Sequence, residues 1–272
     1  MWAMNDYRSH LSVTTWIVLV SLVLGTVVVI PERIFAISVF NSPIAIKFSA
    51  SVAAGALALV ATWAGLEAAL QTHPDYKTSG GHSYLFWGLP SAITLSGAAI
   101  LPVITGQTVW LLTLGGVGAA LAASMAAEWH TLNARASGYG HARLVLNVLA
   151  YAVAAIAFIL IYLSHSRTLV SATLVSIASG LLSVDLLRSN QISTKAVLLY
   201  SLLIAFILAQ FAMVLNYWPF ASVRVALVLL VGFYLLVGYM QQLARRALGR
   251  RQVLEYLLMA AVAVMIVFYF PK

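Results

Sequence analysis

Long apolar runs separated by short polar bends make up almost the whole chain. Each run has about 20 residues, the length that a helix needs to cross the hydrocarbon core of a bilayer. Nine runs can be placed, near residues 11–30, 46–70, 83–104, 107–129, 143–163, 168–187, 195–216, 222–243 and 252–270. The pattern therefore predicts an all-α polytopic membrane protein with nine transmembrane helices, and eight is the alternative count.

The same runs exclude other architectures. They are too long for the strands of a membrane barrel and lack the two-residue alternation of such strands. No stretch between them is long enough for a soluble domain, so the 272 residues are expected to form a single helical transmembrane domain. The first run is interpreted as a retained span, because PER at 31–33 follows it rather than a cleavage site of small residues. The longest connection, residues 31–46, is expected to be an interfacial turn around Phe35, Val39 and Phe40.

Composition agrees with a lipid-facing surface. Hydrophobic residues make up 62% of the chain and charged residues only 8%, whereas soluble domains carry about 25% charged residues. The mean hydropathy is +0.98. So few charges would not cover a water-exposed surface of this size.

The basic residues predict the orientation in the membrane, because cytoplasmic bends are enriched in Lys and Arg. One side, which includes the N-terminus, holds ten of the 15 basic residues. These are Arg8, Lys77, Arg135, Arg143, Arg188, Lys195, Arg245, Arg246, Arg250 and Arg251, against Arg33, Lys47, Arg167, Arg224 and Lys272 on the other side. We therefore expect a cell (plasma or inner) membrane protein with a cytoplasmic N-terminus and a C-terminus on the opposite side. Trp63, Trp87 and Trp129 would form an aromatic belt on the cytoplasmic side, and Trp110 and Trp218 on the other.

A polar residue recurs at the cytoplasmic end of every second span. The ends read AGLEAALQ, AAEWHTLN, SVDLLRSN and GYMQQLAR, with Glu67, Glu128, Asp185 and Gln242 at corresponding points. The intervals are 128 − 67 = 61, 185 − 128 = 57 and 242 − 185 = 57 residues. This period suggests four tandem helical hairpins after an N-terminal span. Spans of this length joined by short bends would give a similar period without a repeat, so both interpretations stay open.

Small residues spaced four apart predict which spans pack closely, because they let helix backbones approach in lipid. They lie in spans two, four and six: Ala50, Ala54 and Ala58; Gly115, Ala119, Ala123 and Ala127; Ala172, Ser176 and Gly180. We expect these spans to pack centrally, so that Glu67, Glu128 and Asp185 converge at the cytoplasmic interface. Pro90 is expected to kink span three, since it removes a backbone donor.

Two interpretations of this acidic cluster are open. The first is a set of interfacial ion pairs, in which Asp185 contacts Arg188, Glu128 contacts Arg143 and Glu255 contacts Arg251. The second is a shared polar pocket, formed by the three acids with Arg143 and Arg188, that binds a head group, an ion or a partner segment.

The remaining side chains predict no catalytic, cofactor-binding or metal-binding residue. The histidines all lie in bends or at span ends: His10, His73, His82, His130, His141 and His165. Haem or chlorophyll would need a histidine ligand within a span, so neither is favoured. Zinc needs three or four converging ligands, and Glu128 and His130 lie on different helix faces, so a zinc site is not favoured either. Nucleophile-elbow, phosphate-loop and HExxH motifs are absent, and with no cysteine there is no thiolate chemistry.

The number of spans resembles the layout of the intramembrane aromatic prenyltransferases. That family carries NxxxDxxxD and DxxxD motifs at the cytoplasmic ends of spans two and six, where they bind magnesium diphosphate. The corresponding stretches here are GLEAALQTHPDYK and SVDLLRSNQ, with a single acid at each span end. The resemblance is therefore one of topology, and it assigns no site residue.

The net charge of +8 is spread over the bends, with one real cluster at Arg245, Arg246, Arg250 and Arg251. Juxtamembrane arginines attract anionic lipid head groups, so membrane lipids are the expected partners rather than nucleic acid. The chain has close-packing positions but no chemical apparatus, which favours a non-catalytic subunit or scaffold of a membrane complex over an enzyme. The alternatives are a carrier or scramblase for a lipid or another apolar molecule, and an intramembrane enzyme acting on a lipid head group.

Overall fold

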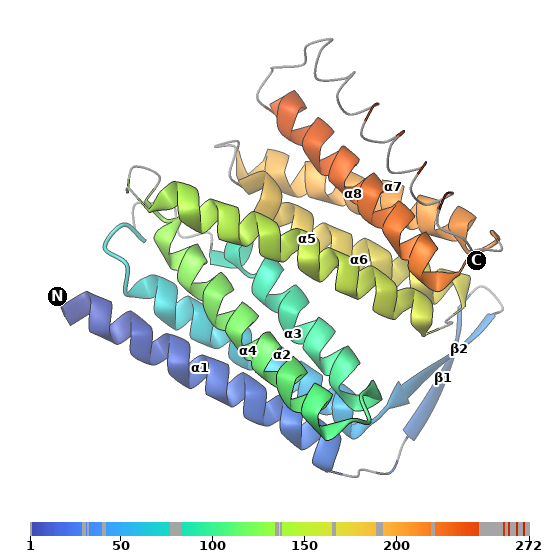
Figure 1. The fold of residues 1–272 in the computed structure, drawn as a ribbon, viewed down its shortest axis with the longest axis horizontal. Helices are drawn as coiled ribbons and strands as arrows, with labels where there is room; N and C mark the ends of the chain where they lie inside the picture. The colour runs from blue at the N-terminus through green and yellow to red at the C-terminus, as the bar shows by residue number, and fades with distance from the viewer. Residues whose placement is uncertain are drawn as a thin grey trace. The chain divides into compact units, whose positions relative to one another are not determined.

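The described part of the chain consists of eight α-helices and one β-hairpin (Figure 1). The computed structural model describes residues 2–28, 31, 33–39, 42–76, 83–133, 136, 138–164, 167–188, 193–218, 221–244, 258, 261, 265 and 269. The helices are α1 (Trp2–Val27), α2 (Ala50–Gln71), α3 (Gly88–Ile100), α4 (Gln107–His130), α5 (Tyr139–Leu163), α6 (Thr168–Arg188), α7 (Thr194–Leu215) and α8 (Ser222–Ala244). Short 3₁₀ turns, η1 (Ser83–Phe86) and η2 (Leu101–Val103), flank α3.

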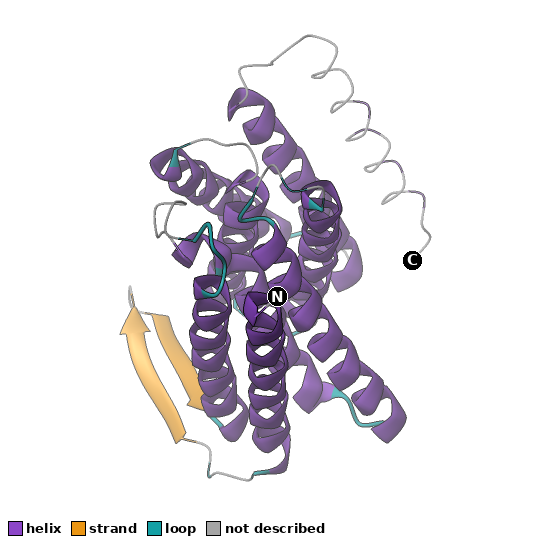
Figure 2. Cartoon of the chain, turned by 90° about the vertical axis from the view of Figure 1, so that its left-hand side faces the viewer, coloured by secondary structure: helices purple, strands orange, loops and turns teal. Residues whose placement is uncertain are grey.

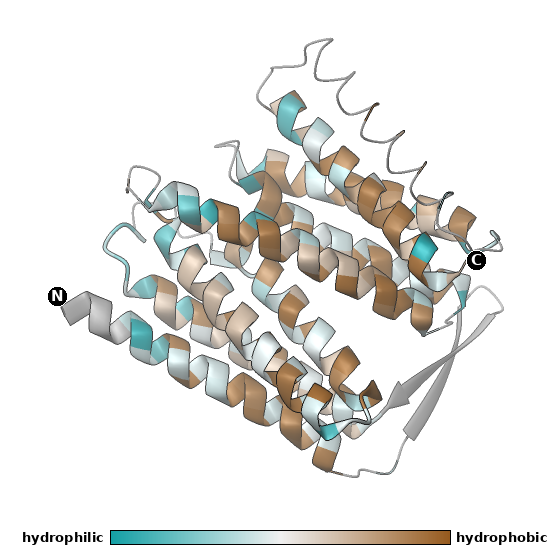
Figure 3. Ribbon diagram, in the orientation of Figure 1, coloured by the Kyte–Doolittle hydropathy of each residue, from teal (hydrophilic) through white to brown (hydrophobic). Residues whose placement is uncertain are grey.

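Among the described helices, all except α3 are long and apolar enough to cross a membrane, with α1 qualifying over Tyr7–Val27. Figure 3 shows apolar residues along these helices and polar residues mostly near their ends. The polytopic membrane fold of apolar helices predicted from the sequence is therefore confirmed. The ninth expected span, 252–270, lies outside the described residues except for Leu258, Ala261, Met265 and Tyr269, which are helical.

The connection after α1 is a β-hairpin, not the expected interfacial turn. Strands β1 (Arg33–Val39) and β2 (Ser42–Phe48) pair antiparallel, with Arg33 opposite Phe48 and Val39 opposite Ser42 (Figure 2). Both strands are rich in isoleucine, phenylalanine and valine, which favour extended backbone. Pro43 is tolerated because both strands of a two-stranded sheet are edges. The hairpin moves the start of the second span from residue 46 to Ala50.

The third apolar run is a shorter helix than predicted, and Pro90 does not kink it. Helix α3 begins at Gly88, so Pro90 lies in its first turn, where a backbone N–H has no partner within the helix. The helix ends at Ile100, directly before the 3₁₀ turn that contains Pro102. Its 13 residues extend about 20 Å, less than the hydrocarbon thickness of about 30 Å.

The described residues group into two compact units. Unit 1 comprises Met1–Ser83 and Ile93–Ala136, and unit 2 comprises Tyr84–Ala92 and Ser137–Lys272. In unit 1, α1 packs along α2 and also contacts α4. In unit 2, α6 packs along α7, while α5 contacts both α6 and α8. Phe158 and Phe233 are fully buried in unit 2 and meet edge to face, with ring centroids 6.1 Å apart.

Small residues do allow close helix approach in both units, and central packing of spans two, four and six stays a prediction. A methyl group at Gly25 of α1 would lie 2.6 Å from Cβ of Ala54, so this position of α2 faces α1. In unit 2 the corresponding contact joins Gly180 of α6 to Ala205 of α7. On α4, by contrast, a methyl group at Gly115 would meet no atom within 4 Å. Each pair thus joins helices that follow one another in the chain, and the tandem hairpin repeat stays a prediction.

Candidate functional site

Three of the five predicted cluster residues meet at the end of α6, in unit 2. Nη2 of Arg188 lies 2.9 Å from Oδ1 of Asp185, and Nη1 of Arg143 lies 3.7 Å from the same oxygen. The Asp185 side chain is fully buried, and the two arginine side chains are 8% and 12% exposed. We call Arg143, Asp185 and Arg188 the α6 clamp.

The local sequence explains how the clamp forms. In SVDLLR, Asp185 and Arg188 are three residues apart and therefore lie on the same helix face, so the predicted ion pair is confirmed. Arg143 comes from the second turn of α5. Its cationic group lies at the C-terminal end of α6, where the helix dipole is negative.

Two side chains from other helices also satisfy backbone carbonyls in the last turn of α6. Nη2 of Arg143 donates to the Asp185 carbonyl at 3.0 Å, and Nε2 of Gln241 in α8 donates to the Leu186 carbonyl at 3.0 Å. The last four carbonyls of a helix have no partner within it, and leaving one buried and unsatisfied is unfavourable. Arg143 of the α6 clamp thus ties α5 to the end of α6, and Gln241 ties α8 to it.

The segment before α3 and the first residue of α3 also contact α6 in unit 2. The guanidinium carbon of Arg188 lies 3.8 Å from the centroid of the Phe86 ring, a cation–π contact. Two residues later, a side chain at Gly88 would collide with the Leu181 carbonyl, so only glycine allows this close approach to α6. Arg188 therefore contacts Asp185 on one side and Phe86 on another.

Glu67 lies in unit 1, near the end of α2, and takes part in different contacts. Its Oε1 accepts hydrogen bonds from Oη of Tyr76 at 2.5 Å and from Nε2 of Gln71 at 3.1 Å. The hydrogen bond to Glu67 raises the pKa of Tyr76, because the neutral phenol is the donor, and burial adds to the effect.

Glu128 also belongs to unit 1 and is fully buried near the end of α4. The hydroxyl of Thr131 lies 2.8 Å from its carbonyl oxygen and 3.5 Å from Oε2 of its carboxylate. Arg143 is the partner that one interpretation of the sequence predicts for Glu128, but it contacts Asp185 in unit 2. The Glu128–Arg143 pair and the convergence of all three acids stay predictions.

An aromatic and histidine cluster joins the ends of three helices of unit 1. The rings of Tyr7 and Trp129 stack with centroids 4.5 Å apart, and His73 meets Trp129 edge to face at 4.6 Å. His130 lies edge to face against Trp129 at 5.0 Å. Nε1 of Trp129 also donates to the Thr72 hydroxyl at 3.2 Å. We call Tyr7, His73, Trp129 and His130 the Trp129 cluster.

Hydrogen bonds around His73 connect the Trp129 cluster to the bends. The backbone N–H of Asp75 donates to Nδ1 of His73 at 3.1 Å, so this nitrogen is an acceptor and the imidazole is neutral. Oδ2 of Asp75 accepts a hydrogen bond from Nδ2 of Asn133 at 3.0 Å, which ties the α2 bend to the α4 bend. Burial lowers the pKa of His73, nearby His130 lowers it further, and Asp75 acts in the opposite direction.

Sequence reasoning missed this cluster, although a signal was present. Tyr7, His73 and Trp129 come from three segments that the basic residues place on one side of the membrane. Considering these bends together, rather than singly, would have grouped the aromatic and histidine side chains. Their mutual distances nevertheless depend on how α1, α2 and α4 pack.

Most of the other residues for which the sequence suggested a role lie outside the described part of the chain. Arg245, Arg246, Arg250 and Arg251, the predicted anionic-lipid contacts, lie outside the described residues, as do Glu255, His82 and His165. Within the described ranges, no three histidine, aspartate or glutamate side chains are grouped as ligands of a metal ion would be.

Comparison with known proteins gives a family but no function. The family model described as "Protein of unknown function (DUF5656)" matches residues 30–270, which is most of the chain. No curated protein matches the chain. No solved structure matches it either. The match runs from the segment before the β-hairpin to the end of the ninth apolar run, so the chain belongs to the DUF5656 family.

Proposed function

We propose that the protein is a non-catalytic, multi-pass component of a larger membrane assembly, in which it acts as a scaffold. The observation that carries this proposal is the α6 clamp. Asp185 is fully buried, and both of its arginine partners are engaged in contacts that tie helix ends together. Buried charges near a membrane face often mark a catalytic or transport site. Here their geometry serves to hold the start of α5 against the end of α6.

The proposed setting is a cell membrane with the N-terminus in the cytoplasm. This orientation is supported by the ten-to-five distribution of the 15 basic residues. It would put the Trp129 cluster and the α6 clamp at the cytoplasmic interface, where Trp and charged side chains are favourable.

One described surface suits docking of a partner helix. Gly115, Gly116 and Ala119 lie on α4 and are exposed. A methyl group at either glycine would meet no atom within 4 Å. Small residues on an exposed transmembrane face let another helix approach closely, which drives association where lipid removes the hydrophobic force.

The proposal is tested by purification from the native membrane in a mild detergent, followed by identification of co-purifying proteins. We expect other membrane proteins in a fixed ratio, and we expect Ala119→Leu to reduce their recovery because the larger side chain blocks close approach. Ala152→Leu is the matched control, since Ala152 is an exposed alanine on α5. It should leave recovery unchanged.

Two results would contradict the scaffold role. One is a wild-type protein that purifies alone and carries a reproducible proton or sodium flux in liposomes. The other is turnover of a lipid head group by the purified chain, which would point to the enzyme alternative.

A further inference from the structure

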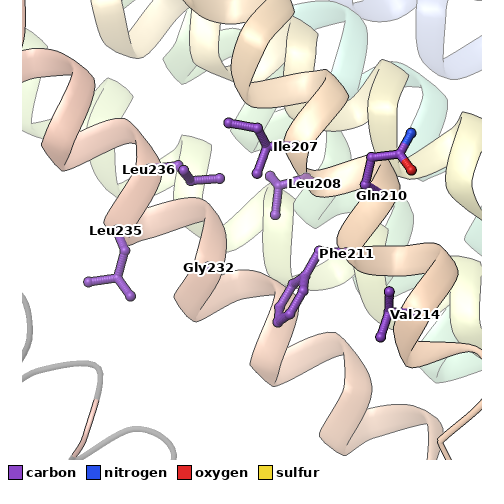
Figure 4. Close-up of a pocket in the computed structure, with 8 residues that line it drawn as sticks. All are labelled: Ile207, Leu208, Gln210, Phe211, Val214, Gly232, Leu235 and Leu236. Atoms are coloured by element: carbon purple, nitrogen blue, oxygen red, sulfur yellow. The ribbon is translucent and has the colours of Figure 1, made fainter.

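An apolar groove runs between α7 and α8 of unit 2 (Figure 4). Its volume is about 460 Å³, within the range of about 300–1,000 Å³ that is usual for sites of small ligands. Helix α7 contributes Ile207, Leu208, Gln210, Phe211 and Val214, and α8 contributes Gly232, Leu235 and Leu236. Gln210 is the polar member of this lining, so the groove suits a hydrocarbon ligand.

Gly232 keeps the groove open. A methyl group at this position would lie 3.6 Å from Cδ2 of Leu208 and 3.7 Å from the ring of Phe211, which is ordinary van der Waals contact. Alanine would therefore fit, whereas a longer side chain would extend into the space between the helices. Figure 4 shows Leu208 and Phe211 on α7 opposite the Gly232 backbone.

The groove has the position and depth expected for a lipid chain. Val214 lies one residue from the end of α7 at Leu215, and Ile207 lies seven residues earlier, which is about 10 Å along the helix axis. Beyond the end of α7, Tyr217 and Trp218 are 84% and 49% exposed. Exposed Tyr and Trp are typical of the membrane–water interface, so the groove extends from that interface into the hydrocarbon.

Positive charge lies at the interfacial end of the same two helices. Arg224 is in the first turn of α8 (Ser222–Ala244), which begins shortly after α7 ends. The start of a helix carries partial positive charge, which adds to that of the guanidinium. A phosphate group there would be complemented electrostatically, while its acyl chain entered the groove.

We propose that the α7–α8 groove binds one acyl chain of an anionic phospholipid, with the phosphate near Arg224. Arg224 is at the start of α8, whereas the arginines that the sequence suggested for lipid contact come after its end in the chain. The lipid site also goes beyond the scaffold role, because a bound lipid is a specific ligand rather than bulk solvent. Groove residues Ile207, Phe211 and Val214 are at least 36% exposed, so an acyl chain can enter from the side.

The test uses phosphatidylglycerol with a photoactivatable diazirine in one acyl chain, added to phosphatidylcholine vesicles that contain the full-length protein. After illumination, labelled peptides are mapped by mass spectrometry. The label should concentrate on residues 207–214 and 232–236, above the level at other lipid-facing helices. Unlabelled phosphatidylglycerol should compete for this label better than unlabelled phosphatidylcholine.

Variants separate the groove from general lipid contact. Gly232→Leu and Ile207→Trp fill the groove from its two walls and should reduce groove labelling about tenfold or more. Ile207 is on the exposed rim, so its variant remains informative where Gly232→Leu fails to fold. Gly232→Ala is the matched control, and Leu202→Trp, at a 69% exposed position of α7 outside the groove, is a second. Both should label like the wild type.

The head-group contact has its own pair of variants. Arg224→Gln should abolish the preference for phosphatidylglycerol over phosphatidylcholine, and Arg224→Lys should retain most of it. Equal labelling of α1 and of the groove would overturn the proposal, as would unchanged labelling in both filling variants. Wild-type protein labelled elsewhere but not in the groove would show that another segment or chain covers it, and would overturn the proposal too.

Discussion

Unit 1 and unit 2 join their helix ends with different kinds of contact. In unit 2, the buried carboxylate of Asp185 binds two arginines, and side chains from α5 and α8 satisfy carbonyls of α6. In unit 1, the ends of α1, α2 and α4 meet through the stacked rings of the Trp129 cluster and through neutral hydrogen bonds such as that from Trp129 to Thr72.

In both units, polar residues at the ends of membrane helices have a structural role. Both sets lie where the chain leaves the apolar runs, and both suggest chemistry when the sequence is considered alone. In each unit the side chains hold neighbouring helix ends together. The two kinds of contact differ in energy: removing one partner of a buried ion pair costs about 3–5 kcal/mol, whereas an aromatic pair contributes about 0.5–1.5 kcal/mol beyond its buried area.

Breaking the α6 clamp should destabilise the protein more than any other change considered below. Asp185→Ala leaves two largely buried arginines without their carboxylate, and removal of one partner from a buried ion pair costs about 3–5 kcal/mol. We expect the free energy of unfolding in detergent micelles, measured by titration with sodium dodecyl sulfate, to fall by this amount. Arg143→Met added to Asp185→Ala should restore part of the loss, because it removes one uncompensated cation.

Glu67→Gln in unit 1 is the matched comparison. Glu67 is only part-buried, and the side chains that donate hydrogen bonds to it, which include Tyr76 and Gln71, are neutral. An amide oxygen can still accept from Tyr76, so the expected loss is about 1 kcal/mol. A loss for Asp185→Ala no larger than that for Glu67→Gln would remove the distinction between the two units.

The next effect concerns close packing in unit 1. A methyl group at Gly65 of α2 would collide with the side chain of Thr14 in α1, a β-branched residue with little freedom to move. Gly65→Ala should therefore lower the free energy of unfolding by about 1–3 kcal/mol. The same measurement in detergent micelles checks it.

Gly115→Ala is the control for this prediction. A methyl group there would meet nothing within 4 Å, and alanine is the better helix former by about 1 kcal/mol. The control should therefore be neutral or slightly stabilising. Thr14→Ala should rescue Gly65→Ala only in part, because it removes the two nearest atoms but keeps Cβ of residue 14, which lies 2.6 Å from the new methyl group. Equal effects of the two glycine substitutions would show that α1 and α2 can separate at little cost.

The sequence predicted the parts of this fold that depend on local pattern. Run length and hydropathy identify the seven long described helices, and the spacing of Asp185 and Arg188 predicts their ion pair. The pattern does not predict the β-hairpin, because its two strands lie beside apolar runs and residues 46–48 continue directly into the apolar run of α2. Its signal was two stretches rich in Ile, Val and Phe, separated by Phe40-Asn41.

The sequence alone does not predict which distant segments contact one another. Arg143 and Asp185 are 42 residues apart, and charge alone made Glu128 an equally reasonable partner for Arg143. Pairing of Ala54 with Gly25 and of Gly180 with Ala205 likewise depends on which helices are neighbours. Small-residue spacing shows that a face can pack closely, but it does not say against which helix.

The smallest expected effect is a pH dependence in unit 1, where titration of His73 distinguishes the neutral Trp129 cluster from the ionic clamp. His73 is 9% exposed and accepts the Asp75 N–H through Nδ1. Burial and nearby His130 hold its pKa below the ordinary value of 6.5, with Asp75 opposing them. Below pH 6.5 the unfolded chain therefore binds more protons at this position than the folded chain, and folding stability falls with falling pH.

The stabilising contribution should be fully present above the unfolded pKa and lost as the pH falls through the lowered folded pKa of His73. We expect the midpoint of thermal unfolding in detergent to decrease as the pH is lowered from neutral into this window. His73→Asn keeps an acceptor for the Asp75 N–H but does not titrate, so it should flatten the slope. Asp185→Ala should lower the whole curve and leave its slope over this window unchanged. A wild-type slope retained in full by His73→Asn would assign the pH dependence to a group other than His73.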